Sequence, residues 1–157
     1  KAVPHVDGIA GFIRTSSVAI TIDIGLVLVC DQIAVIVDVI AELLIGITRD
    51  PTGLLVLTLG FGGTLTELID DSVSILLPCN ASDIGHALTQ LKLYPLLTGY
   101  RGASKADLTA IVDAIVAIAH YAQDNALRLV ELEVNPLLAR AKDAVAADAL
   151  LRLMADP

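Results

Sequence analysis

The stretch that decides the fold reads Glu131-Leu132-Glu133-Val134-Asn135-Pro136-Leu137. Alternate side chains of a β-strand share one face. Glu131, Glu133 and Asn135 are therefore expected to line a polar face. Val130, Leu132 and Val134 are expected to pack on the other side, against a hydrophobic core. The stretch predicts a strand with one oxygen-rich face.

Asp148 follows Asn135 by thirteen residues, a spacing that suits a hairpin. If the chain turns back over residues 141–143, residues 144–149 form the returning strand. Asp148 then lies opposite Asn135 on the same face, with Cβ atoms about 5 Å apart. Magnesium takes oxygen ligands and often only one or two from the protein, which leaves positions for water and phosphate oxygens. The pattern predicts a magnesium site on a β-hairpin, and hence nucleotide chemistry.

The same stretch also allows a purely structural interpretation. Glu131 and Glu133 could form the solvated face of an edge strand, and Asn135-Pro136 an ordinary turn. Asp148 would then cap a terminal helix over residues 149–154. The stretch alone leaves both interpretations open.

The composition indicates one globular domain. The chain has 157 residues, of which 55% are apolar but only 3% aromatic, so Leu, Ile, Val and Ala must build the core. Mean hydropathy is high, at +0.76. Acidic residues nevertheless interrupt residues 18–48, and the uncharged run 51–66 is shorter than the ~20 residues of a spanning helix. With no signal peptide visible, we expect a cytoplasmic protein that does not act at a membrane.

Charge and cysteine usage exclude other classes. A net charge of −8 argues against a nucleic-acid partner, which would need a basic face. Cys30 and Cys79 are isolated, so neither a disulfide framework nor a zinc site is indicated, and both are expected to be buried. His86 and His120 lie in expected helices and are interpreted as structural.

The order of elements predicts an α+β (α/β) fold with a mixed or antiparallel sheet and helices on one face. Strands are expected in 18–30, 42–48 and 54–59, and a further strand pair or an extended segment in 64–77, with Asp70-Asp71 as its turn. Residues 33–41 fit strand or helix. One helix is expected behind a cap at Ser82 and a second behind Ser104, with a loop over 93–103 between them. The apolar positions of these helices recur at helical spacing: Ile84, Ala87, Leu88 and Leu91 in the first, and Leu108, Ile111, Val112, Ile115 and Ala119 in the second.

Two further segments could contact phosphate. Gly60-Phe61-Gly62-Gly63 could expose backbone N–H groups, although a glycine-rich bend between strands explains it as well. Glu67 follows as a possible orienting group or a simple surface carboxylate. Arg101, between Gly99 and Gly102, suits a phosphate or carboxylate, although such a loop often carries an arginine without a role.

Taken together, four segments resemble a known family in their order. They are 42–51, then 60–63 with Glu67, then Gly99-Tyr100-Arg101-Gly102, then 131–137 with Asp148. From about residue 42 to 151 the chain resembles the ATP-grasp domain of ADP-forming acyl-CoA (acetate–CoA) ligases, relatives of the succinyl-CoA synthetase β subunit. The resemblance implies the C-terminal lobe of an ATP-grasp fold and a partial ATP-grasp domain over 1–157. Residues 1–17 would hold a gapped Lys/His motif, and residues 18–157 the sheet and helices.

The resemblance also implies site residues. Lys1 would contact phosphate and His5 would be transiently phosphorylated, although Val6 stands where the family has a lysine. Gly62, Gly63, Glu67 and Arg101 would serve the nucleotide and its phosphates. Asn135 and Asp148 would hold magnesium, and Glu133 would face the phosphohistidine.

The implied function is phosphate transfer between ATP/ADP and a phosphohistidine during acyl-CoA formation. Cofactors would be ATP/ADP and Mg²⁺, with CoA a substrate of the complete enzyme. Partners would be CoA-binding and ligase domains or an α-type subunit, together with a small carboxylic acid, in an oligomeric assembly. The alternative is a non-catalytic ATP-grasp module for nucleotide sensing or a subunit interface.

Overall fold

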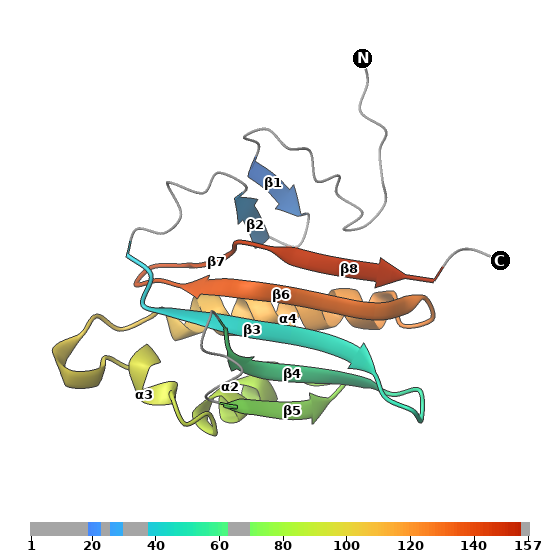
Figure 1. Ribbon diagram of the computed structural model, residues 1–157, viewed down its shortest axis with the longest axis horizontal. Helices are drawn as coiled ribbons and strands as arrows, with labels where there is room; N and C mark the ends of the chain where they lie inside the picture. Colours follow the sequence, from blue (N-terminus) through green and yellow to red (C-terminus); the bar gives the residue numbers. More distant parts are fainter. Residues whose placement is uncertain (1–18, 23–25, 30–37, 63–69, 155–157) are drawn as a thin grey trace, which may run out of the picture.

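The structure is a computed structural model that describes residues 19–22, 26–29, 38–62 and 70–154. Eight strands form one sheet in the order β1-β2-β7-β6-β3-β4-β5, with β8 also paired to β6 (Figure 1). The strands are β1 (Ala19–Ile22), β2 (Leu26–Val29), β3 (Ala41–Arg49), β4 (Leu55–Phe61), β5 (Ser72–Leu76), β6 (Leu129–Ala139), β7 (Ala144–Ala146) and β8 (Ala149–Leu153).

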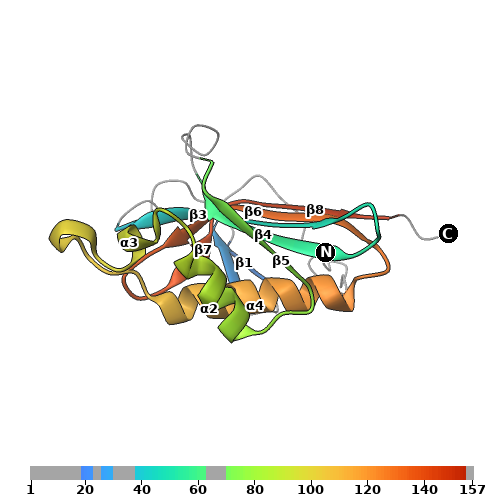
Figure 2. The ribbon, with the colours of Figure 1, turned by 90° about the horizontal axis from the view of Figure 1, so that it is seen from below.

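The sheet is mixed, because β2 and β7 run parallel while every other pair is antiparallel. Two helices, α2 (Ala81–Thr89) and α4 (Leu108–Asp124), lie on the same side of it (Figure 2). This arrangement confirms the predicted α+β fold with helices on one face. It leaves the opposite side of β3, β4 and β6 without a described helix; we call that side the open face.

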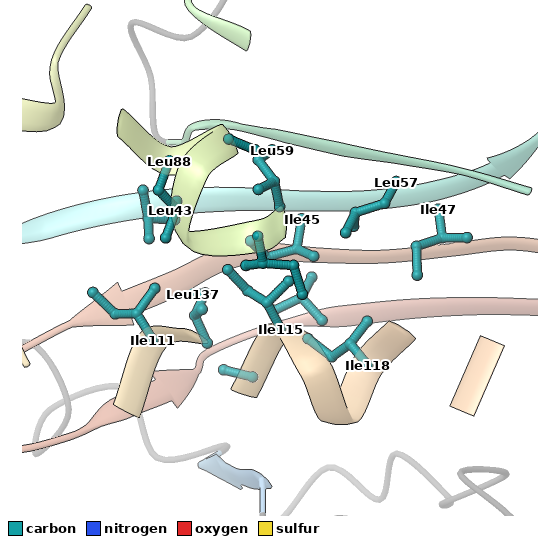
Figure 3. Close-up of a cluster of buried hydrophobic side chains, with 14 of the residues drawn as sticks. Leu43, Ile45, Ile47, Leu57, Leu59, Leu88, Ile111, Ile115, Ile118 and Leu137 are labelled. Atoms are coloured by element: carbon teal, nitrogen blue, oxygen red, sulfur yellow. The ribbon is translucent and has the colours of Figure 1, made fainter. Parts of the chain in front are cut away.

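The hydrophobic core lies between the sheet and the helices. Leu43, Ile45 and Ile47 alternate along β3 and are fully buried, as the period of a strand requires. Ile111 and Ile115 of α4 meet them from the helical side (Figure 3). Burial of these branched aliphatic side chains is the main force that holds α2 and α4 to the sheet.

Both helices begin elsewhere than predicted. Asn80, not Ser82, caps α2: its Oδ1 accepts the N–H groups of Ser82 and Asp83 at 2.8 and 3.1 Å. The Asp83 carboxylate accepts the Asn80 N–H at 2.9 Å and closes a capping box. Asp107, not Ser104, caps α4, because its carboxylate accepts the Ala110 N–H at 3.0 Å.

The segment predicted as a loop contains two short helices. They are α3 (Tyr94–Leu97), which has a proline in its first turn, and the 3₁₀ helix η1 (Tyr100–Gly102). Proline is tolerated there because the first N–H groups of a helix have no partner within it. The expectation of a plain loop over 93–103 is therefore wrong.

The end of the chain settles two further expectations. Val130 is 42% exposed while Leu129 is fully buried, because a bulge against β8 lies between Leu129 and Glu131. The prediction of Val130 in the core is therefore wrong. The alternative of a terminal helix capped by Asp148 is also wrong, because Ala149–Leu153 is strand β8.

The remaining predictions concern isolated side chains and the membrane. Cys79 is partly buried, and burial, with a smaller contribution from Asp83, raises the pKa of its thiol. His86 and His120 lie on α2 and α4 with exposed side chains. Cys30 lies outside the described residues. No helix in the described part of the chain is long and apolar enough to cross a membrane.

Candidate functional site

Asn135 and Asp148 lie opposite each other, as the hairpin prediction required. The Asn135 N–H donates to the Asp148 carbonyl at 3.2 Å, and the Ala147 N–H donates to the Pro136 carbonyl at 3.0 Å. β6 is held between β3 on one side and β7 and β8 on the other. The two residues are therefore fixed by a paired backbone and do not depend on a loose loop.

The pairing at this level departs from a regular ladder. Val134 pairs with Ala149 and Leu137 with Ala146, so each strand carries two residues between its paired positions. β3 has only Leu44 between the corresponding partners Leu43 and Ile45. Asn135-Pro136 therefore form a β-bulge against β3, and Ala147-Asp148 match that bulge on the other side. Bulges of this kind re-aim side chains beside functional sites.

The side chains at this level offer oxygen atoms. Glu133 and Asn135 share the open face, and the Asn135 Nδ2 donates to the Glu133 Oε1 at 3.3 Å. The Asp148 carboxylate is exposed and accepts the Ala149 N–H at 2.8 Å. The described residues hold no cluster of three or more His, Cys, Asp or Glu side chains. An oxygen-only set with few protein ligands fits magnesium and does not fit zinc.

Gly62 closes one side of this site. A Cβ built there would lie 3.0 Å from the Asn135 Oδ1 and 3.2 Å from the Leu43 carbonyl carbon and oxygen. Only a glycine lets the chain pass this close to the Asn135 amide oxygen. The Gly62 N–H donates to the Glu42 carbonyl at 2.8 Å, so Gly62 offers close approach and not a free donor. Gly63 and Glu67 lie outside the described residues.

Arg101 lies in a different part of the molecule from these oxygen atoms. It occupies η1 with a φ of 51°, and its guanidinium stands 5.3 Å from the centre of the Tyr100 ring. Tyr100 lines a cavity of about 650 Å³ together with residues 140–143 of the β6–β7 turn. Neither Asn135 nor Asp148 lines that cavity.

An ion pair fixes the β6–β7 turn beside this cavity. The Arg140 Nε and Nη2 donate to the two Asp143 carboxylate oxygens, each at 2.6 Å. This hydrogen bonding raises the pKa of Arg140. The turn that brings Asp148 back to Asn135 is thereby held by a bidentate pair.

The structure therefore brings together part of the predicted site. Glu133, Asn135, Asp148 and Gly62 meet at one level of the sheet. Lys1 and His5 lie outside the described residues. Sequence reasoning missed Gly46, which pairs with Glu133 across β3 and β6. The available signal was a lone glycine inside an apolar strand pattern, which marks a bulge or a close approach.

Comparisons with known proteins agree with this geometry. The family described as ATP-grasp domain matches residues 24–153. The chain is 32% identical over 114 residues to subunit beta of ADP-forming acetate–CoA ligase II from Pyrococcus furiosus, covering 71% of this chain and 48% of that protein. It is 30% identical over 112 residues to subunit beta of ligase I from the same organism, covering 71% and 48%.

A solved structure gives the same relationship. The dinucleotide-forming acetyl-coenzyme A synthetase 1 of Ca. Korarchaeum cryptofilum, in complex with coenzyme A and Mg-AMPPCP, is 33% identical with a TM-score of 0.68. The match covers 72% of this chain and 53% of that one, and the chain spans about half the length of the curated relatives. The expected fold is confirmed: the chain belongs to the ATP-grasp domain family, and its relatives include the beta subunits of ADP-forming acetate–CoA ligases.

Proposed function

We propose that this chain is the nucleotide-binding part of an ADP-forming acyl-CoA synthetase, which transfers phosphate between ATP/ADP and a phosphohistidine during acyl-CoA formation. The observation that carries the proposal is the pair Asn135 and Asp148, where a backbone hydrogen bond joins β6 to the link between β7 and β8, with Gly62 against the Asn135 amide oxygen. A hairpin with only a structural role does not need two oxygen-bearing side chains, Asn135 and Asp148, at the bulge of β6 and beside Gly62.

Each residue has a definite task in this proposal. Asn135 and Asp148 would hold Mg²⁺, which when bound offsets the charge of the nucleotide phosphates. Gly62 would border the phosphates beside Asn135, where only a glycine lets the backbone approach the Asn135 Oδ1 this closely. Glu133 holds the Asn135 amide by a hydrogen bond, which turns Oδ1 away from Glu133. The Glu133 carboxylate also faces the histidine that receives the phosphate.

Other parts of the proposal rest on the resemblance. Lys1 would contact phosphate and His5 would carry it within residues 1–17, and Gly63 and Glu67 would add to the nucleotide site. Arg101 would bind a phosphate or carboxylate of a partner domain, since it lies on an exposed segment beside the β6–β7 turn. CoA-binding domains or an α-type subunit and a small carboxylic acid would complete a cytoplasmic, oligomeric enzyme.

The test uses the full-length protein with any partner subunit. Given ATP, magnesium, CoA and a panel of short acids, it should form acyl-CoA and ADP. Asp148→Ala should weaken Mg-ADP binding in calorimetry at least ~10-fold, because a metal ligand is lost while the fold stays intact. Asp113→Ala, which removes an exposed carboxylate from α4, is the matched control and should bind as the wild type does.

Two results would overturn the proposal. Absence of acyl-CoA and ADP with every acid, despite Mg-ADP binding, would favour the non-catalytic module. Equal Mg-ADP affinity in Asp148→Ala and Asp113→Ala would remove Asp148 from the metal site.

A further inference from the structure

Gly46 lies at the centre of β3, where the fold does not require a glycine. Its neighbours Ile45 and Ile47 are fully buried, so position 46 faces the open side of the sheet. Its backbone is not in the left-handed region, and an added Cβ would meet only the Leu44 Cδ2, at 3.8 Å. A glycine inside a strand weakens that strand, and no packing contact at position 46 requires one.

At two nearby positions, Gly60 and Gly62, close packing explains why the residue is a glycine. A Cβ at Gly60 would lie 3.1 Å from the Asp71 carbonyl, and one at Gly62 would lie 3.0 Å from the Asn135 Oδ1. Packing therefore excludes side chains at both positions. At Gly46 the space above the backbone is open, which is typical of a place where a ligand or another chain approaches closely.

Gly46 belongs to a row of paired residues across the open face. It pairs with Glu133 on β6 and with Thr58 on β4, and Thr58 pairs with Ser74 on β5. The Thr58 and Ser74 hydroxyls hydrogen-bond to each other at 2.9 Å. Paired residues point to the same face of a sheet, so the side chains of Glu133 and Thr58 flank position 46 on the open face. Because Gly46 has no side chain, it leaves a shallow gap between the Glu133 carboxylate and the Thr58 hydroxyl.

The negative charge of the carboxylates beside this gap determines which kind of group can bind in it. Glu133 lies two residues from Asn135 along β6, a step of about 7 Å, and Glu131 follows on the same face. Carboxylates repel a polyphosphate chain but favour an N–H donor that gains positive charge. Phosphoryl transfer needs the acceptor on the side of the phosphate away from the departing ADP. The gap therefore suits the acceptor rather than the nucleotide.

We infer that Gly46 carries no side chain so that the imidazole of a phosphate-accepting histidine can lie against β3, beside Glu133. This role rests on the proposed function, and Gly46 is a positioning residue within it. One imidazole nitrogen attacks the γ-phosphorus, a P–N bond forms, and the bond to the β,γ-bridging oxygen breaks. ADP leaves with that electron pair. The N–H of the other nitrogen donates to Glu133, which offsets the positive charge developing on the ring.

The experiment compares Gly46→Val and Gly46→Ala with Thr48→Ile in the full-length protein with any partner subunit. Thr48→Ile adds bulk to the same face of the same strand, two residues beyond the gap. Each protein is tested for thermal unfolding, for Mg-ADP affinity by calorimetry, and for acid-labile label from γ-labelled ATP. The Ala variant keeps the test open if Val disturbs the strand, since its Cβ meets no close neighbour.

Gly46→Val should unfold at or above the wild-type temperature, bind Mg-ADP within about twofold of the wild type, and lose at least ~100-fold in the rate of label transfer. Gly46→Ala should lose less, and Thr48→Ile should match the wild type. Normal labelling of both Gly46 variants would overturn the inference while the proposed function stands. Loss of Mg-ADP affinity in a folded Gly46→Ala would assign the gap to the nucleotide and so overturn it too. If the wild-type protein takes up no label on histidine, the proposed function fails and this role falls with it.

Discussion

Glu133 differs from Glu131 although both lie on the open face of β6. Glu131 forms an ion pair with Arg152 on β8 at 3.2 Å. Glu133 instead accepts a hydrogen bond from the Asn135 side chain and pairs with Gly46. One carboxylate links two strands, and the other belongs to the candidate site.

Under the proposed function, Glu133→Gln should slow acyl-CoA formation by the full-length protein at least ~100-fold, because the proposed role of Glu133 is to stabilise charge in the transition state. The change in unfolding free energy should stay within about 0.5 kcal/mol, as for most surface substitutions. Steady-state rates and urea unfolding check both parts. Glu131→Gln is the matched control, and a comparable slowing there would show that Glu133 has no special role.

Asp50 sets the pH dependence of the β3–β4 turn. Its carboxylate accepts hydrogen bonds from the Thr52 hydroxyl at 2.7 Å and the Leu54 N–H at 2.9 Å. These bonds, the Thr52 hydroxyl first, hold the pKa of Asp50 below its usual value. The charged form is thus favoured in the folded state.

The stability that Asp50 adds should be fully present above its unfolded pKa and lost as pH falls through the lower folded pKa. Thermal unfolding of the wild type and Asp50→Asn from pH 6 to pH 2 measures this. The advantage of the wild type should shrink below about pH 4, the region of an unperturbed Asp. A constant difference over the whole range would contradict it.

At the scale of elements, the caps decide where the helices begin. Asn80→Ala should destabilise the protein by about 1 kcal/mol, because the N–H groups of Ser82 and Asp83 lose their acceptor. Ser82→Ala, at the position that the sequence favoured, should change the unfolding free energy by less than about 0.5 kcal/mol. Denaturant unfolding of the two variants distinguishes the caps, and a larger loss at Ser82 would reverse the assignment.

The strands were more predictable than the helix ends. The strand over 42–48 was predicted from its run of branched aliphatic residues, and β3 covers that range. A cap depends on which of several neighbouring polar side chains reaches the free N–H groups, and Asn80, Ser82, Ser104 and Asp107 are all capable residues. The local sequence does not determine which of these residues caps the helix. The bulge at Val130 escaped prediction for a similar reason, because it depends on pairing with β8.

At the scale of the whole molecule, one core joins the sheet to its helices. Ile115→Ala should cost about 2–5 kcal/mol, since the fully buried side chain leaves a cavity against β3. Leu127→Ala removes an aliphatic side chain that is 90% exposed and should cost far less. Urea unfolding provides both values. Similar losses at the two positions would mean that α4 does not pack as described.

The site was predictable only in part, because its residues come from separate segments. The hairpin pairing of Asn135 with Asp148 follows from local spacing, and the structure confirms it. The placement of Gly62 against Asn135 needs the pairing of β3 with β4 and β6. Arg101 looked equivalent to these residues in the sequence, but tertiary packing puts its segment beside the β6–β7 turn.

The matched irregularity at Asn135-Pro136 and Ala147-Asp148 constrains how this hairpin can change length during evolution. Val134 and Leu137 are both buried although two residues lie between them, so the core would keep its alternation if one of those two residues were lost. Loss of one residue from β6 alone would shift the register of β6 with β7 relative to its register with β8. Insertions and deletions in this hairpin should therefore occur in pairs, one on each strand, and a homologue lacking the position of Asn135 should also lack that of Asp148.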